Sequence, residues 1–431
     1  MVFGFFGKKQ AEEEPEEEVE PISFLGPISG VEVNLKANAR LVEAGLMRAK
    51  DLVTDALSRR ADTLRLEPKG PQAVVTILVD GVPFPGGKMA KAEGHAITQM
   101  LKLLAGLDVK ERKKSQSGGI KAEFDSKAYT LSVKSLPVPD GERLIVRMQD
   151  SKLKLDAPAD LGMGEAMRVK LRDLCTAPGV LLVTGPSGSG TTTTLYALVR
   201  NVDAYIYTIF TIGDTEGRKL QQISPMEVDP SDDLATTITR AVRKEANVIL
   251  CDPIKDADAA RAIFSKAEDV MLLSELSAKD APSAVLQLIE WVGDAKLVAA
   301  GLKGVLTQKL IRLLCPDCRL AFKPKPEFLK KLGLPEDTPA LYRKPPEPQE
   351  GSMEMACEKC GAMGYFGRTA MFEFLEVTDG MRELIAGKPD AAAIRSQMKK
   401  EKMTTLQHDG LRLVAEGRTS LEELQRVFKP A

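Results

Sequence analysis

Hydrophobic positions follow two different patterns along the chain, and the change falls near residue 150. Before it, short apolar runs with alternating polar residues, AVVTILVDGVPF (73–84) and AYTLSVKSLPV (128–138), are typical of half-buried strands. Between them, GHAITQMLKLLAGL (94–107) has the spacing of a helix with one apolar face. These patterns predict a small N-terminal α/β domain over residues 35–150.

After residue 150 the apolar runs are continuous instead of alternating. They are GVLLVTG (179–185), AYIYTIFTIGD (204–214), ANVILCDP (246–253) and DVMLLSEL (269–276), separated by segments with helical spacing. Such runs are typical of parallel strands buried on both faces. They predict an α/β nucleotide-binding core over residues 151–305. A cysteine-bearing insertion with a return to the core is expected over 306–376, and a helical subdomain over 377–431.

Charge changes this picture mainly at the N-terminus. The segment AEEEPEEEVEP (11–21) is a block of like charge interrupted by proline, which predicts a disordered acidic tail over residues 1–34. Over the whole chain 60 Lys and Arg oppose 61 Asp and Glu, so no basic field favours nucleic acid as a partner. No apolar run approaches the roughly 20 residues of a membrane-spanning helix, and nothing at the start resembles a cleavable export signal. We therefore expect a soluble, cytoplasmic protein.

A glycine-rich segment after the first continuous run carries the candidate nucleotide chemistry. Gly185, Gly190 and Thr192 match the pattern G-x-x-x-x-G-K-[ST], in which backbone N–H groups bind phosphate oxygens. Thr192 can offer a hydroxyl to Mg²⁺, but Thr191 stands at the lysine position, so binding of ATP and Mg²⁺ is expected to be weak. The alternative is a glycine-rich turn that binds no ligand. The predicted nucleotide-binding residues are Gly185, Pro186, Ser187, Gly188, Ser189, Gly190, Thr191, Thr192 and Thr193.

Four of the six cysteines form two C-x-x-C pairs, which suggests a metal site. The pairs are Cys315 with Cys318 and Cys357 with Cys360. Four thiolates suit tetrahedral zinc, although the separation of the pairs is long for a compact zinc ribbon and reduced buried thiols are the alternative. A site closed by four sulfur ligands has no position for a substrate. The expected zinc is therefore structural, holding together a loop-rich insertion.

Ordered segments from about Ala39 to Phe428 resemble the ATPases that power type II secretion and type IV pilus assembly. They include ADTLRLEP (61–68), DGERLIVRM (140–148), GPSGSGTTTTLYA (185–197), GVLTQKLIRLLCPDC (304–318) and GYFGRTAMFEFLEV (364–377). The resemblance implies a RecA-like P-loop core with a zinc-binding insertion, in a hexameric ring that is cytoplasmic and peripheral to the inner membrane. Implied partners are copies of this chain or an intact family ATPase in the ring, and the inner-membrane platform protein.

The same resemblance exposes losses at catalytic positions. Gly213 and Pro253 stand where the family has glutamates that order or activate water, which leaves Asp214, Asp252 and Arg147 as weak catalytic candidates. Two histidine and three arginine positions are also lost, at Val270, Ser277, Thr76, Leu78 and Ser132. These losses favour a pseudo-ATPase subunit with a structural or regulatory role. The alternatives are an active divergent motor and a nucleotide sensor without turnover.

Overall fold

The computed structural model describes residues 20–153, 155–213, 220–229, 231–346 and 357–429. The chain divides into two compact units, Met1–Leu153 and Lys154–Ala431. Among the described residues, no helix is both long enough and apolar enough to cross a bilayer.

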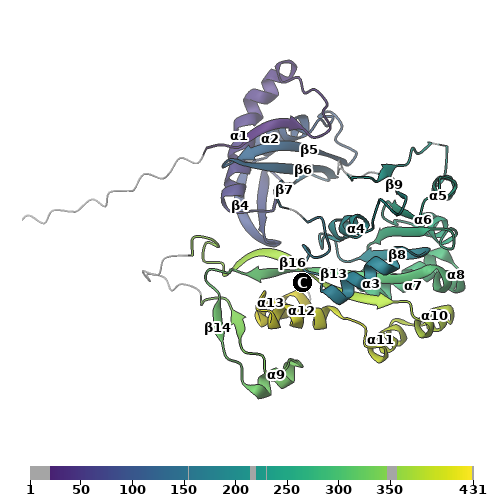
Figure 1. Cartoon of the computed structure of the whole chain (residues 1–431). Helices are drawn as coiled ribbons and strands as arrows, with labels where there is room; N and C mark the ends of the chain where they lie inside the picture. The colour runs from purple at the N-terminus through teal and green to yellow at the C-terminus, as the bar shows by residue number, and fades with distance from the viewer. Residues whose placement is uncertain (1–19, 154, 214–219, 230, 347–356, 430–431) are drawn as a thin grey trace, which may run out of the picture. The chain divides into compact units, whose positions relative to one another are not determined.

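The first unit is an antiparallel sheet against which two helices, α1 (Ala39–Ser58) and α2 (Lys91–Leu104), are packed (Figure 1). Its strand order is β1-β5-β6-β7-β2-β3-β4. In β3, Val75, Ile77 and Val79 are buried while the residues between them are half-buried, because successive side chains point to opposite faces of a strand. The strands are β1 (Ser23–Pro27), β2 (Thr63–Lys69), β3 (Gln72–Val79), β4 (Val82–Ala90), β5 (Gln116–Phe124), β6 (Lys127–Val138) and β7 (Gly141–Asp150). The short helix η1 (Lys36–Asn38) precedes α1.

Helices α1 and α2 approach each other closely at Gly45. A Cβ at this position would lie only 2.7 Å from the carbonyl oxygen of Ala96 in α2. Glycine is therefore required for the two helices to stack at this distance. On one face of α2, Ile97, Met100, Leu101 and Leu104 are fully or almost fully buried, as the spacing of the sequence predicts.

The predicted disordered tail over residues 1–34 is wrong at its C-terminal part. Strand β1 pairs with β5, with Ser23 opposite Glu123 and Pro27 opposite Ile120. Ile22 just before it is completely buried. A sheet edge can recruit a short segment through backbone hydrogen bonds, and the pattern of so few residues gives little warning of this. Residues 1–19, with most of the acidic block, lie outside the described residues.

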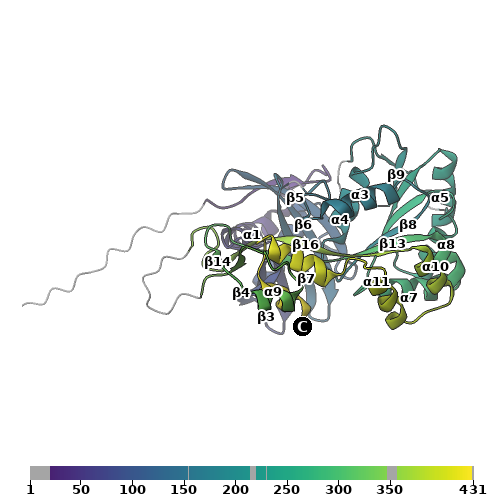
Figure 2. The same ribbon diagram turned by 60° about the horizontal axis from the view of Figure 1, so that its bottom comes forward.

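The second unit contains a mostly parallel sheet in the order β10-β9-β11-β12-β8-β13-β16, in which only β16 is antiparallel to its neighbour. Apolar side chains of β8, β11 and β12 alternate between two cores. One core contains residues of α5 to α8, α10 and α11, and the other contains residues of α3 and α4. In Figure 2, α3 lies on one side of β8 and β13, and α7 and α11 lie on the other. The continuous apolar runs therefore do correspond to strands buried on both faces, and the predicted α/β class is confirmed.

The elements of this sheet and its covering helices have the following bounds. The strands are β8 (Gly179–Thr184), β9 (Ile209–Ile212), β10 (Ser224–Pro225), β11 (Val248–Cys251), β12 (Met271–Leu276), β13 (Leu302–Leu314) and β16 (Tyr365–Glu376). The helices are α3 (Glu165–Leu174), α4 (Thr191–Arg200), α5 (Leu234–Arg243), α6 (Ala257–Phe264), α7 (Ala281–Val292) and α8 (Ala295–Gly301).

The strand expected from the run 204–214 is shorter than its apolar letters suggest. Only Ile209–Ile212 form β9, while Tyr205 is 89% exposed and Ile206 is 71% exposed. These two apolar residues belong to a turn that leads into the strand. An apolar run by itself does not show how many of its residues the neighbouring strand can pair.

The remaining part of the second unit carries the cysteines and the C-terminal helices. Strand β13 belongs to the core sheet as far as Leu314, so the expected boundary at residue 306 falls inside a strand. Residues 315–364, as far as they are described, form an arm with β14 (Leu320–Phe322), α9 (Pro326–Leu332) and β15 (Leu341–Arg343). The chain ends in α10 (Asp379–Ala386), α11 (Ala391–Lys400), α12 (Leu406–Ala415) and α13 (Leu421–Phe428).

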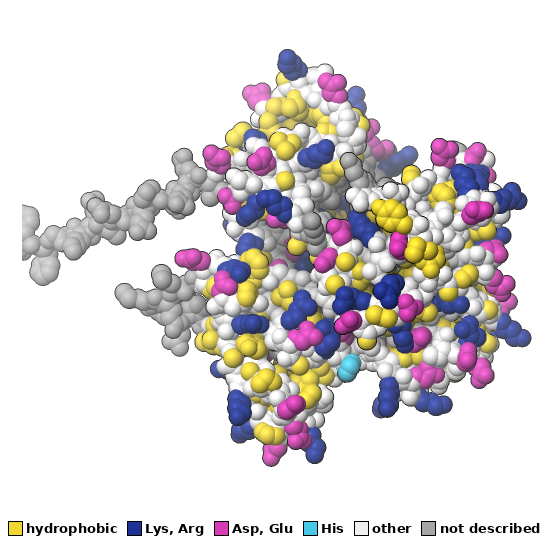
Figure 3. Space-filling view, viewed as in Figure 1, with side chains coloured by type: hydrophobic (Ala, Val, Ile, Leu, Met, Phe, Trp, Pro, Cys, Tyr) yellow, Lys and Arg dark blue, Asp and Glu magenta, His cyan; other side chains and the backbone are white. Residues whose placement is uncertain are grey.

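The surface carries both signs of charge. On the face in Figure 3, Lys and Arg side chains are interspersed with Asp and Glu side chains. This distribution agrees with the near balance of charge in the sequence, at a formal net charge of −1.

Candidate functional site

The glycine-rich loop joins the buried strand β8 to helix α4. Gly188 and Gly190 have φ values of +82° and +85°, which favour glycine, and Gly190 stands at the N-terminal cap of α4. A Cβ at Gly185 would lie 2.6 Å from the carbonyl oxygen of Gln308 on β13. The loop therefore makes a sharp strand-to-helix turn, which is what phosphate-binding loops require.

The loop offers hydrogen-bond donors, but no positive side chain, to an anionic ligand such as phosphate. Thr191, Thr192 and Thr193 form the first turn of α4, whose backbone N–H groups have no partners within the helix. Gln308 Nε2 donates to the carbonyl oxygen of Ser189 at 2.7 Å, which ties the loop to β13. The hydroxyl of Ser189 is buried and has no hydrogen-bond partner among the described residues. The loop thus offers backbone and hydroxyl donors to phosphate, but at Thr191 it offers no charge.

A carboxylate that sequence analysis did not single out lies beside the loop. Glu275 near the end of β12 accepts a hydrogen bond from the hydroxyl of Thr192, with Oγ1 and Oε2 3.2 Å apart. Strands β12 and β8 are neighbours, and Glu275 pairs with Val183 just before the loop begins. The available sequence signal was an isolated acid near the end of the otherwise apolar run DVMLLSEL.

The predicted candidate Asp252 lies at the carboxyl end of β11, beside Gly213. A Cβ on Gly213 would overlap the carboxyl group of Asp252, and Gly213 also has a φ of +112°. Two hydrogen bonds hold the backbone of Asp252. Its N–H donates to the carbonyl oxygen of Ile212 at 3.1 Å, and its carbonyl oxygen accepts from Ser274 Oγ at 2.7 Å. A side chain at position 213 would therefore require the carboxyl group of Asp252 to move.

The other two catalytic candidates, Asp214 and Arg147, stay predictions. Pro253 is exposed after β11 and has no carboxylate, and the next residue, Ile254, donates its N–H to the carbonyl oxygen of Glu275 at 2.8 Å. Asp214 lies outside the described residues. Arg147 is an exposed residue of β7 in the other unit of the chain, so its contribution stays a prediction.

The four predicted cysteine ligands lie together. Their Sγ atoms are all within 4.8 Å of one another. Two contacts are 3.9 Å, between Cys315 and Cys357, and 3.7 Å, between Cys318 and Cys360. Zn–S bonds of about 2.3 Å in a tetrahedron place neighbouring sulfurs about 3.8 Å apart. The geometry and the chemistry of the four donors therefore fit zinc.

Backbone hydrogen bonds shape the two cysteine turns. Cys315 N–H donates to the carbonyl oxygen of Gly364 at 3.0 Å, and Gly364 N–H donates to Sγ of Cys360 at 3.4 Å. The backbone N–H of Cys360 lowers the pKa of the Cys357 thiol to about 7, which favours the thiolate that metal binding needs. By contrast, burial raises the pKa of Cys175 and of Cys251 to about 12, as expected for small core residues.

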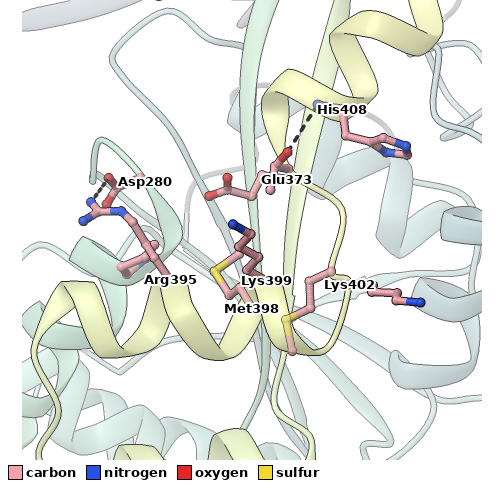
Figure 4. Close-up of a pocket in the computed structure, with 10 residues that line it drawn as sticks. Asp280, Glu373, Arg395, Met398, Lys399, Lys402 and His408 are labelled. Carbon is pink, nitrogen blue, oxygen red and sulfur yellow. Dashed lines mark hydrogen bonds and ion pairs between the residues drawn. The ribbon is translucent and has the colours of Figure 1, made fainter. Parts of the chain in front are cut away.

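A separate pocket of about 500 Å³ lies between α7, α11, α12 and β16. None of the loop residues 185–193 lines it. At one side of this pocket, Arg395 forms an ion pair with Asp280 at 2.8 Å, as Figure 4 shows. Glu373 accepts from the N–H of Ala281 at the start of α7, and burial raises its pKa. This pocket is not the predicted nucleotide site.

Comparison with known proteins identifies the family to which the chain belongs. A model described as type II/IV secretion system protein matches residues 41–426. The type IV pilus assembly ATPase PilB of Thermus thermophilus is 28% identical over 97% of this chain and 45% of its own length. The type II secretion system protein E of Dickeya dadantii is 31% identical over 88% of this chain and 74% of its own. The chain thus spans less than half of the first relative and about three quarters of the second.

Two solved structures share the fold. The ATPase DotB of Legionella pneumophila has a TM-score of 0.54 at 13% identity, covering 87% of this chain and 94% of DotB. The pilus retraction motor PilT with bound ADP has a TM-score of 0.52 at 15% identity, covering 88% of this chain and 96% of PilT. The resemblance inferred from the sequence is confirmed: the chain belongs to the family of type II/IV secretion system proteins.

Proposed function

We propose that the chain is a pseudo-ATPase subunit of a type II secretion or type IV pilus assembly machine, with a structural or regulatory role. The observation that carries this proposal is the paired replacement at the carboxyl edge of the sheet. Asp252 fills the space in which a glutamate at position 213 would have to start, and Pro253 supplies no acid. The phosphate loop keeps its turn while losing its lysine at Thr191.

The size of the expected loss follows from how phosphoryl transfer is catalysed. This reaction depends almost entirely on positioning and electrostatic stabilisation, so each charged group matters. Removing a single preorganised stabiliser typically costs about 3 kcal/mol, or about 100-fold in rate. The chain lacks the lysine and two acidic residues of the family pattern. Weak nucleotide binding without useful turnover is the expected result.

Assembly features support a role inside the machine. Relatives are ATPases and proteins of secretion and pilus systems, and the family match extends over both units of this chain. The proposed arrangement is a hexameric ring made of this chain or shared with an intact family ATPase. The ring would be cytoplasmic and peripheral to the inner membrane, against the platform protein. A structural zinc at the four cysteines would hold the arm formed by residues 315–364.

The alternative is an active, divergent ATP-hydrolysing motor. The observation that favours it is Glu275, which places a carboxylate beside Thr192 from an unexpected strand. Under this alternative, a relocated acid replaces the missing ones. The two functions differ in one measurable quantity, the rate of phosphate release.

The test is Mg–ATP binding and steady-state phosphate release by the purified chain, beside an intact family member. We expect weak binding and release at background. Thr191→Lys should improve binding because it adds a charge at the phosphates, while release stays near background. Ala177→Lys, at an exposed residue before the start of β8 and outside the loop, is the matched control for added charge. If the unaltered chain, or Thr191→Lys alone, releases phosphate as fast as the intact relative, the pseudo-ATPase proposal is wrong.

Restoring the acids is harder than the sequence suggests. Gly213→Glu places a side chain against the carboxyl group of Asp252, at a backbone φ that disfavours any side chain. Combining Gly213→Glu with Asp252→Gly removes this overlap, and Pro253→Glu and Thr191→Lys complete the restored set. Gly213→Glu should lower the melting temperature strongly when Asp252 is kept. The same change should lower it less in a chain that already carries Asp252→Gly.

A further inference from the structure

The missing lysine leaves the phosphate loop without a fixed positive charge at Thr191. If the loop binds nucleotide, as the proposed function assumes, another cation has to balance the phosphate charge. In family sites of this kind Mg²⁺ shares that task with the lysine. The remaining question is which residues of this chain face the metal.

Glu275 and Thr192 are brought together by the sheet and not by the sequence, since they are 83 residues apart. Pairing of β12 with β8 fixes the backbone of Glu275 one residue before the end of β12. Its carbonyl oxygen is also held by the N–H of Ile254 at 2.8 Å. The carboxylate is therefore carried by a rigid strand and directed to the first turn of α4.

The separation of the two oxygens suits shared ligation of a metal. Octahedral Mg²⁺ with bonds of about 2.0–2.1 Å places neighbouring ligand oxygens about 2.9 Å apart. Thr192 Oγ1 and Glu275 Oε2 are 3.2 Å apart, which is near enough for both to bind one ion as neighbouring ligands. Magnesium sites in nucleotide-binding proteins commonly use one or two carboxylates together with substrate phosphates.

We propose that Glu275 is a magnesium ligand of this chain, and that with Thr192 it makes nucleotide binding dependent on the metal. The carboxylate attracts Mg²⁺, and the metal takes over the charge balance that the absent lysine would provide. Without metal, the same carboxylate repels the phosphates. The ligand class is accordingly a magnesium complex of a nucleoside di- or triphosphate.

A competing interpretation of the same contact predicts the opposite change in nucleotide affinity. If Glu275 only repels phosphates, its neutralisation should strengthen nucleotide binding with and without Mg²⁺. If Glu275 is a metal ligand, neutralisation should weaken binding in Mg²⁺ and leave binding in EDTA unchanged or stronger. The two ideas are therefore separated by a single variant.

The test measures the affinity for a fluorescent ADP analogue in Mg²⁺ and in EDTA, for the unaltered chain, Glu275→Gln and Glu275→Asp. Loss of a residue that only hydrogen-bonds to a metal ligand typically costs about 10- to 100-fold in metal affinity, so we expect a drop of at least that order for Glu275→Gln in Mg²⁺. Glu275→Asp should retain part of the affinity. Glu268→Gln, an exposed acid just before β12, is the matched control and should change nothing. Binding of Mn²⁺ in the presence of ADP, followed by electron paramagnetic resonance, should be lost in parallel.

Each outcome decides the matter. An unchanged or higher affinity of Glu275→Gln in Mg²⁺ overturns the inference. If the unaltered chain shows no binding in excess nucleotide, the same pair is compared in the Thr191→Lys background, where an absence of weakening in Glu275→Gln likewise overturns it. Equal melting temperatures of the variants exclude misfolding as the cause. Phosphate release by the same samples tests the proposed function separately, because rapid release would refute the pseudo-ATPase without changing the metal dependence.

Discussion

Replacing Lys102 by methionine should strongly destabilise the first unit. The side chain of Lys102 has no exposed surface, and that of its partner Glu142 is 3% exposed. The ammonium group donates to Glu142 Oε1 at 2.6 Å and to the carbonyl oxygen of Glu111 at 2.7 Å. Glu142 also accepts from Ser135 at 2.9 Å and from Gln99 at 2.6 Å. Methionine would fill much the same volume, but it would leave the carboxylate buried without its counter-charge.

The magnitude follows from this burial. Removing one partner of a buried ion pair costs about 3–5 kcal/mol, whereas exposed pairs contribute about 0–1 kcal/mol. Burial opposes ionisation of Glu142, yet the hydrogen bonds from Lys102 and Ser135 outweigh it and lower its pKa. A lowered pKa means that the ionised carboxyl stabilises the fold above its unfolded pKa of about 4.3, and that this contribution is lost as the pH falls through the folded pKa. The difference in the free energy of unfolding between Lys102→Met and the unaltered chain should therefore shrink as the pH is lowered.

The assay is urea unfolding at neutral pH and near pH 4, followed by circular dichroism and by tryptophan fluorescence. The single tryptophan, Trp291, belongs to the second unit. We expect its transition to stay in place while the circular dichroism transition of the first unit shifts to lower urea. Lys127→Met is the matched control, because Lys127 pairs with Asp125 at 3.4 Å and its side chain is 52% exposed.

Two results would refute this reasoning. One is a loss of stability in Lys102→Met no larger than that in Lys127→Met. The other concerns the double variant Lys102→Met with Glu142→Gln, in which no charge is left buried. It should recover part of the stability, since a paired removal is much less costly than an unpaired one. A double variant as unstable as Lys102→Met alone would mean that packing, and not charge, dominates.

Three further predictions concern the second unit and the whole assembly. Protein purified without chelators should carry one zinc per chain by metal analysis, and Cys357→Ser should lose it and melt at a lower temperature, because metal binding contributes folding free energy; zinc well below one per chain would contradict this. Since burial raises the pKa of Glu373, its carboxyl contributes stability below the unfolded pKa of about 4.3, and this is lost as the pH rises through the folded pKa. Glu373→Gln should therefore gain melting temperature over the unaltered chain at about pH 8 but not at about pH 4, and equal differences at both values would refute it. Finally, the chain should enter a ring in size-exclusion light scattering with an intact family ATPase and the platform protein, and a strict monomer in that mixture would contradict the proposed assembly.

Local chemistry made several features predictable from the sequence alone. Gly188 and Gly190 mark a turn that needs positive φ, and that turn lies where the pattern placed it. The spacing within each C-x-x-C pair limits where two thiols can point, so the cysteine cluster was foreseeable once the two pairs were noticed. The change from alternating to continuous apolar runs reported the change from an antiparallel to a mostly parallel sheet. In each case the information lies within a few consecutive residues.

Contacts across the sheets were decided only by the tertiary structure. Glu275 meets Thr192 because β12 lies next to β8, and Asp252 covers Gly213 because β11 lies next to β9. Hydrophobic periodicity shows which face of a strand is buried, but it does not show which strand becomes its neighbour. The same holds for Lys102 with Glu142, 40 residues apart, where a charged residue in an apolar helix face found a partner on a distant strand. Strand order determines which side chains share the carboxyl edge of a sheet, and strand order is set by the packing of the whole unit.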